Sequence, residues 1–418
     1  MTRRLFAFAA AILMLFPHGV LADELEAQRD RIAAEIAALR MLPPLDEIDD
    51  ALITTDELRE RMPALIARDY PEAEALADQR ILVALGLIPA DYQLMQAYLD
   101  LLVSQVAGFY DPATDEMYVI SDTGSFGGED QYTYSHEAVH ALQDAAFDLE
   151  ALTVAAMDVS DDASLALAAL VEGDATLASN DYLLAHPELT SDILFSSGDS
   201  GSGGIDTAPA FLSTGLLFPY LIGLDFVTAV RDAGGWDAVN AAYADPPIST
   251  EQVMHPEKYL DRDDPTPVVV PDLAPVLGGD WSLLDANTLG EFTILQMLAD
   301  LEAGEGLNLL TGTFRFPVPA MNAAAGWDGD QYAFWVNGED ELLRIDAEWD
   351  TPQDAAAFSR AMAALAERRF HNVFRSEADG SRRMDGDVAT VVITLDGTRV
   401  TYVQSTVPEL APLAASIK

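Results

Sequence analysis

Two histidines, His136 and His140, stand four residues apart in a stretch whose apolar residues predict a helix. On a helix, residues at this spacing leave the same face about one turn apart, so both imidazoles can bind a single metal ion. Glu137 projects from the neighbouring side, where its carboxylate can reach metal-bound water without ligating the metal itself. The pattern predicts a zinc site with His136 and His140 as ligands and Glu137 as the catalytic carboxylate.

A catalytic zinc needs a third protein ligand, because such sites hold the ion with three side chains and keep one position for water. Residues 165–182 are predicted to form a following helix, and Glu172 lies in its apolar run. A carboxylate there is costly to bury unless a cation meets it, so Glu172 is the predicted third ligand. Asp174 is a candidate to hydrogen-bond a ligand histidine, and Asp174 or Asp181 remain alternatives for the ligand itself.

His255 is the candidate for stabilising the negative charge that develops on a carbonyl oxygen during hydrolysis. It belongs to a segment bounded by prolines, residues 246–256, so its backbone is constrained. On one interpretation its imidazole donates a hydrogen bond on the open side of the metal; on the other it only bonds a backbone carbonyl. The sequence leaves both interpretations open.

The composition limits the classes of partner and of site. The chain has 418 residues, of which 50% are hydrophobic, and a formal net charge of −48. A surface this acidic repels phosphate groups, which argues against nucleic acid and anionic membranes as partners. Cysteine is absent. A disulfide, a thiolate nucleophile and a cysteine-ligated metal are therefore excluded, and a metal must be held by histidine and carboxylate.

The first 22 residues have the pattern of a cleavable signal peptide. Arg3 and Arg4 supply the positive charge, residues 5–16 an apolar run, and residues 20–22 the cleavage positions. Twelve apolar residues are too few to span a bilayer, so we expect a secreted or periplasmic protein with no membrane span after signal removal. The other long apolar stretch, 211–230, is interrupted by proline and glycine and predicts a pair of buried helices.

The rest of the chain divides into three predicted regions of an α+β, predominantly helical fold. Residues 23–108 form a helical N-terminal region, and residues 109–325 carry the candidate site, with a strand at 116–120 and a flexible loop at 196–204. Residues 326–418 form a small α/β domain. The charge supports this division, because residues 341–418 carry nine basic and twelve acidic residues, a net of −3 against −45 for the rest.

The C-terminal domain has its own pattern of elements. Strands are predicted at 332–336 and 342–349, followed by a helix that Thr351 caps and that runs to about residue 369. A hairpin over 388–403 turns at Asp396 and Gly397, a dipeptide that favours tight turns. We therefore expect a core of its own in this domain, separate from the metal site.

His136 to His140 followed by Glu172 resembles the gluzincin group of zinc metallopeptidases. Together with residues 108–112, 172–175 and 249–256, the motif also resembles a family of secreted bacterial proteins classed as metallopeptidases without established substrates. The likeness covers about residues 80–300. It implies a zincin-like catalytic domain at 109–325, with His136, His140 and Glu172 as Zn²⁺ ligands and Glu137 as the catalytic residue.

These observations predict a secreted zinc-dependent enzyme that hydrolyses peptides or proteins, in which Glu137 assists the attack of metal-bound water on a peptide carbonyl. The strand at 116–120 would be the sheet edge along which an extended peptide docks. The alternative is a secreted scaffold or interaction protein that binds zinc without turnover.

Overall fold

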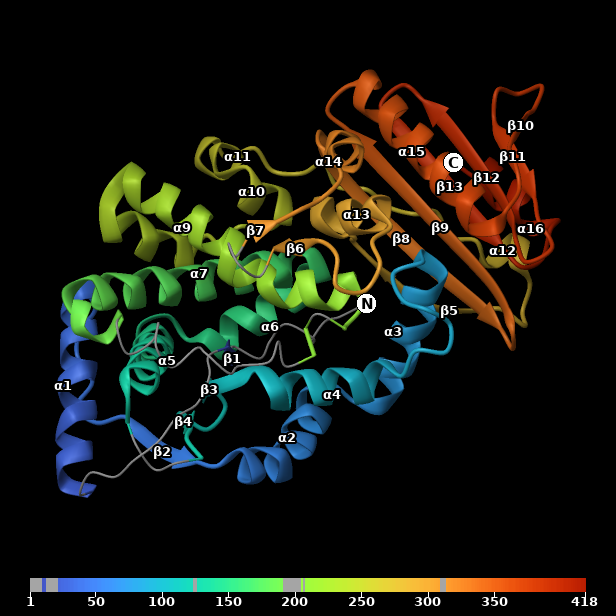
Figure 1. Cartoon of the computed structure of the whole chain (residues 1–418). Coiled ribbons are helices and arrows are strands. Elements are labelled where there is room, and N and C mark those ends of the chain that lie inside the picture. The colour runs from blue at the N-terminus through green and yellow to red at the C-terminus, as the bar shows by residue number, and fades with distance from the viewer. Residues whose placement is uncertain (1–9, 13–21, 123–125, 191–203, 206, 309–312) are drawn as a thin grey trace.

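The computed structural model describes residues 10–12, 22–122, 126–190, 204–205, 207–308 and 313–418 (Figure 1). Most of the predicted signal peptide and nearly all of the loop predicted at 196–204 lie outside these residues. Helices dominate the first two-thirds of the chain, and a large antiparallel sheet dominates the last third. The coarse prediction of an α+β, predominantly helical fold is therefore confirmed.

Four helices and one strand make up the N-terminal region. Thr54 and Glu57 form the capping box that their spacing predicts, with the Glu57 carboxylate accepting a hydrogen bond from the Thr54 N–H at 2.7 Å. Gly86 ends the third helix at a φ of 83°, a left-handed conformation that costs glycine little. The elements are α1 (Ala22–Arg40), β2 (Asp49–Ile53), α2 (Thr55–Asp69), α3 (Glu72–Leu85) and α4 (Leu94–Gln105).

A four-stranded sheet in the order β1-β3-β4-β2 packs near the helix that carries the two histidines. The strand predicted at 116–120 forms as β4, but it lies between β3 and the parallel strand β2. It therefore has no free edge for a docking peptide, and that prediction is wrong. The boundary predicted after residue 108 falls inside β3, so the first two regions share this sheet. Its other strands are β1 (Ala10–Ile12), β3 (Val106–Asp111) and β4 (Glu116–Ile120).

Long helices form the layer that carries the candidate site: α5 (Gly128–Phe147), α6 (Leu149–Val159), α7 (Asp161–Ala185) and α9 (Ala210–Ala244). The stretch 211–230 is a single helical run in α9, not the predicted pair. Pro219 and Gly223 lie inside the helix, and the break comes later, where Gly234 and Gly235 leave helical φ and ψ. By length and composition α9 could cross a membrane, but 67% of its most apolar window is buried inside the protein.

Two glycines bring α7 and α9 into backbone contact. A Cβ added at Gly173 would overlap the carbonyl group of Gly223, and one added at Gly223 would overlap the carbonyl oxygen of Ala169. Larger residues at these positions would separate the helices. Gly223, which the sequence suggested as a helix interruption, instead serves this close approach.

The C-terminal sheet has seven strands in the order β10-β11-β12-β13-β9-β8-β5, all antiparallel. The predicted strands, helix and hairpin are all present, and Thr351 caps α15 as predicted, with its side chain accepting from the Asp354 N–H. The edge strand β5 comes from before residue 326, so the domain recruits more of the chain than predicted. The strands are β5 (Ser282–Asn287), β8 (Trp327–Asn337), β9 (Asp340–Trp349), β10 (Arg375–Ser376), β11 (Arg382–Asp385), β12 (Thr390–Asp396) and β13 (Arg399–Ser405).

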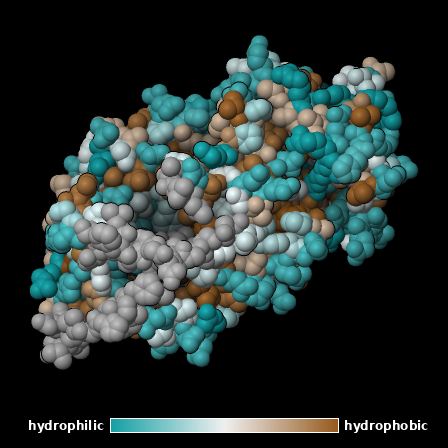
Figure 2. All heavy atoms as spheres, viewed as in Figure 1, coloured by the Kyte–Doolittle hydropathy of each residue, from teal (hydrophilic) through white to brown (hydrophobic). Residues whose placement is uncertain are grey.

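Helices cover both faces of this sheet. One face packs against α15 (Pro352–Phe370), and the other packs against α16 (Leu410–Ser416) through Leu342 and Val403. The core on the α15 face joins Ile345 and Phe358 to Leu82 of α3, so the expectation that this domain has a core of its own is wrong. The view in Figure 2 shows hydrophilic residues over much of the surface of this domain. The remaining elements are α10 (Thr250–Met254), α11 (Pro256–Asp261), α12 (Ala274–Leu277), α13 (Gly290–Ala299), β6 (Leu307–Asn308), β7 (Thr313–Phe314), α14 (Val318–Ala324), α15 (Pro352–Phe370) and α16 (Leu410–Ser416).

Candidate metal centre

Helix α5 positions His136, Glu137 and His140 in the interior of the protein. The helix begins where the Asp130 carboxylate accepts a hydrogen bond from the Gly127 N–H at 2.7 Å, which satisfies one free donor of the first turn. Strands β3 and β4 pack on α5, and so do α1 and α7. All three side chains are at most 3% exposed.

The structure brings Glu172 of α7 to the two imidazoles. The Nε2 atoms of His136 and His140 lie 3.2 Å apart, and Glu172 Oε2 lies 3.1 Å from the first and 3.4 Å from the second. Ligand atoms around a tetrahedral zinc at about 2.0–2.1 Å are about 3.3 Å from one another. These residues therefore form a buried group that could hold a metal ion, and among the described residues it is the one group of this kind.

The electrostatics of the three groups are strongly coupled. Burial alone would lower the pKa of His140, but the carboxylates of Glu172 and Glu137 outweigh it and raise that pKa to about 9. Burial prevails at His136 and lowers its pKa. Burial would raise the pKa of Glu172, but the two imidazoles overcome it and lower that pKa to about 2. A proton on His140 and a metal ion would therefore compete for the same place beside Glu172.

Glu137 lies on the side of α5 that faces the sheet. A Cβ added at Gly108 of β3 would come within 3.1 Å of Glu137 Cγ and 2.8 Å of Thr133 Cγ2, so the strand approaches the helix closely at this point. The glycine leaves room for the glutamate stem and holds it between strand and helix. Gly108 is the first of residues 108–112, which are part of the resemblance described in the sequence analysis.

Asp174 does not contact a ligand histidine directly, as had been suggested from the sequence, but reaches one through Gln143. The Gln143 carboxamide donates to Asp174 Oδ2 at 3.0 Å, and its Oε1 lies 2.8 Å from His140 Nδ1. Gln143 lies one turn beyond His140 on the same face of α5, and this i, i+3 spacing is the signal that could have identified it.

The two alternatives for the third ligand have other partners. Asp174 pairs with Arg40 at 2.5 Å, and Asp181 pairs with Arg231 at 2.7 Å near the surface. Neither carboxylate joins the group formed by Glu172 and the histidines.

His255 lies elsewhere and pairs with Glu291, whose carboxylate is 3.0 Å from its Nε2. The preceding helix α10 is fixed to α7 where Thr250 Oγ1 donates to Asp162 at 2.6 Å. His255 is not part of the group formed by Glu172 and the two histidines, and its role at the metal stays a prediction. The flanking prolines limit the backbone of the segment but do not set its direction.

Tyr220 is a neighbour of the site that sequence reasoning missed. Its ring stacks on the His136 ring, with centroids 6.0 Å apart and planes 28° from parallel. The close crossing at Gly223, three residues later on α9, carries this ring to the metal ligands. No local pattern marks Tyr220, because its proximity depends on how α7 and α9 pack.

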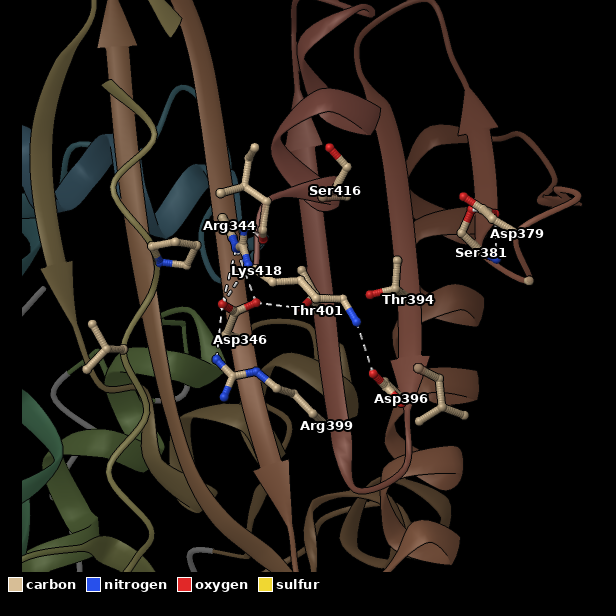
Figure 3. A pocket seen from close by; sticks show the side chains of 16 residues that line it. Arg344, Asp346, Asp379, Ser381, Thr394, Asp396, Arg399, Thr401, Ser416 and Lys418 are labelled. Carbon is tan, nitrogen blue, oxygen red and sulfur yellow. Dashed lines mark hydrogen bonds and ion pairs between the residues drawn. The ribbon is translucent and has the colours of Figure 1, made fainter. Parts of the chain in front are cut away.

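A separate cavity of about 870 Å³ opens on the C-terminal sheet (Figure 3). Its floor holds Asp346, which accepts hydrogen bonds from Arg344 at 2.9 Å, Thr401 at 2.6 Å and Arg399 at 3.3 Å. At its rim the Lys418 ammonium lies 3.3 Å from Asp396. The charges of this cavity are largely met by one another.

Comparison with known proteins concerns only the C-terminal part. Residues 282–415 match the family model of a domain of unknown function, DUF8575. No curated protein and no solved structure matches the chain. The matched region begins at β5, contains the seven-stranded sheet and includes none of the candidate metal ligands.

Proposed function

We propose that the chain is a secreted zinc-dependent peptidase. The observation that carries the proposal is the set of three ligand atoms, which lie 3.1 to 3.4 Å from one another on two buried helices. Two imidazoles and one carboxylate are a donor set typical of catalytic zinc, which leaves a fourth position for water. The neighbouring Glu137 fits a hydrolytic role better than a purely structural metal site.

Zinc bound there would supply a Lewis acid that lowers the pKa of a coordinated water toward about 7 and polarises a peptide carbonyl. Glu137 would accept the proton of the attacking water and deliver it to the nitrogen of the leaving amine. Its stem is held between α5 and Gly108, so the carboxylate needs little reorganisation during the reaction. His136, His140 and Glu172 would hold the ion and take no part in proton transfer.

The test is the substitution Glu137→Gln in the full mature chain. We expect the variant to retain one zinc per chain and the wild-type melting temperature while losing cleavage of a peptide library by at least about 10²-fold, because a general base is removed and the ligands are kept. Glu150→Gln, which changes an exposed glutamate on α6, is the matched control and should cleave normally.

Two results would contradict the proposal. Cleavage by Glu137→Gln at the wild-type rate would remove Glu137 from the chemistry. Zinc binding by a wild-type protein that cleaves no peptide in the library would favour the alternative of a zinc-binding scaffold without turnover.

A further inference from the structure

A chain of buried polar groups connects the ligand His140 to the N-terminal helix. It runs from His140 through Gln143 and Asp174 to Arg40, the last residue of α1. Each of these side chains is at most 1% exposed. Arg40 pairs with both carboxylate oxygens of Asp174, through Nε at 2.5 Å and Nη2 at 3.0 Å. Polar groups buried to this degree need hydrogen-bond partners, and each of these four side chains bonds to the next one in the series.

Donor and acceptor roles are fixed at each hydrogen bond between His140, Gln143, Asp174 and Arg40. An arginine only donates, so Asp174 accepts, and the Gln143 amide that faces Asp174 must present its NH₂ group. The same NH₂ group donates to the Val171 carbonyl oxygen at 3.0 Å, so a flipped amide would place oxygen against two acceptors. Gln143 Oε1 therefore faces His140 Nδ1 as an acceptor.

An acceptor at Nδ1 selects one tautomer of His140. In the neutral ring the proton resides on Nδ1, and the lone pair of Nε2 is available toward His136 Nε2 and Glu172 Oε2, where a metal ligand is needed. The ring orientation is also fixed, because Gln143 is anchored on both α5 and α7. Asp174, held by Arg40, and the Val171 carbonyl thus set, through Gln143, which nitrogen of His140 carries the proton.

The position of Arg40 is itself well defined. Its guanidinium lies 4.4 Å from the centre of the Trp236 ring, and Asp174 receives a further bond from the Tyr243 hydroxyl at 2.8 Å. Ile32 and Ile36 of α1 belong to the same core as Val139 of α5. The packing that fixes Arg40 therefore also fixes α1 against the helix of the ligands.

We propose that Gln143 and Arg40 are positioning residues for the metal ligand His140, which makes the N-terminal helix α1 a part of the metal centre. The inference rests on the proposed metal site but not on peptide hydrolysis. It gives α1 a role that the division of the chain at residue 108 did not anticipate.

The test measures zinc affinity by competition with a chelator in the full mature chain and in the variants Gln143→Met, Arg40→Lys and the two combined. Loss of an outer hydrogen-bond partner typically weakens metal binding by about 10–100-fold, which we expect for Gln143→Met. Arg40→Lys keeps the charge but loses the two-pronged contact, and we expect it to weaken zinc binding by about 3–10-fold. Arg31→Met, an exposed arginine of the same helix, is the matched control.

The double variant separates positioning from general stability. If Arg40 acts through Gln143, Arg40→Lys has no further effect on zinc affinity when Gln143 is already methionine, so the two effects are not additive. Additive losses, or wild-type affinity in Gln143→Met, would overturn the inference. Should Gln143→Met fail to fold as the apoprotein, Gln143→Ala replaces it, because it also removes the hydrogen bond to His140 and places no charge beside Asp174. A wild-type protein that binds zinc but cleaves nothing leaves this inference intact.

Discussion

The metal-ligand group and the floor of the C-terminal cavity are both buried and polar, but their charges are met in different ways. In the cavity, Asp346 is bonded to Arg344, with Arg399 and Thr401 beside it. In the metal-ligand group, the partners of the Glu172 carboxylate among the described residues are two imidazoles, which are cationic only when protonated. One cluster contains its permanent cation, and the other is arranged to receive one.

This difference separates a structural charge pair from a candidate site more clearly than burial or cavity size does. The cavity is large, yet its guanidinium also donates to the backbone carbonyls of Ala414 and Ile417 and so holds the C-terminal segment in place. The Arg40–Asp174 pair beside the metal ligands is of the same closed kind. In the metal-ligand group the buried carboxylate meets two imidazoles at the spacing of metal ligands, and this combination points to function.

Zinc binding at the metal-ligand group should have a large effect on stability. At free zinc about 1,000-fold above the dissociation constant, we expect the free energy of unfolding of the wild type to rise by about 4 kcal/mol, because the ion binds the folded state. His140→Ala should lose this gain, as measured by chemical unfolding with zinc and with chelator. His186→Ala changes a more exposed histidine that pairs with Glu35 and should keep the gain. If zinc stabilised His140→Ala as much as the wild type, the metal-ligand group would not be the zinc site and would not differ from the cavity floor in this way.

The stability of the Arg344–Asp346 cluster at the cavity floor should depend on its cation and not on zinc. Arg344→Met leaves Asp346 buried with weaker partners and should cost about 3–5 kcal/mol of stability with or without the metal. Replacing both residues, as Arg344→Met with Asp346→Leu, should recover part of this loss because no uncompensated charge remains. Unfolding with urea measures the wild type and both variants with and without zinc, and zinc affinity should stay at the wild-type value. A zinc-dependent loss would show that the two regions are coupled.

A third cluster, Glu251 with Lys258, has charges that are only partly compensated. Burial raises the pKa of Glu251 to about 7 from 4.5, although the Lys258 ammonium 2.7 Å away lowers it, while the carboxylates of Glu291 and Asp350 add to the rise. The folded state therefore binds more protons than the unfolded state between these pH values. The contribution of the Glu251 titration to stability is present at pH 4.5 and is lost as the pH rises to about 7.

Removing this titration should give the smallest of the three effects. Between pH 5 and 7.5 we expect the wild type to lose roughly 1–3 kcal/mol more of its free energy of unfolding than Glu251→Gln does. Glu257→Gln, which changes an exposed glutamate of α11, controls for net charge. Urea unfolding at each pH gives the free energy of unfolding as a function of pH. Parallel curves for wild type and Glu251→Gln would mean that Lys258 compensates Glu251 fully.

Features that depend on local spacing could be predicted from the sequence. The capping box at Thr54, the cap at Thr351 and the tight turn at Gly397 each depend on a few neighbouring residues. The pairing of His136 with His140 depends only on helix geometry. Glu172 was identified for another reason, because a carboxylate in an apolar run is conspicuous wherever the helix packs.

Features that depend on how distant elements pack could not be predicted in this way. The interior position of β4 results from its pairing with β2, more than sixty residues earlier, and no residue of β4 records that pairing. Arg40 reaches Asp174 across 134 residues of sequence. The path of the segment that carries His255 is likewise set by the contact of Thr250 with Asp162, which its prolines do not determine.

The contact of Gly173 with Gly223 has a mechanical consequence for the candidate metal site. Where two helices meet through backbone atoms, no side chain lies between them that could change rotamer and let them slide past each other. Gly173 adjoins Glu172, so the spacing between this ligand and its neighbours on α9 is set by a hard contact. The site therefore has little clearance for shear between α7 and α9. This rigidity depends on the absence of a side chain at Gly173 and Gly223, because any other residue would place a Cβ between the helices.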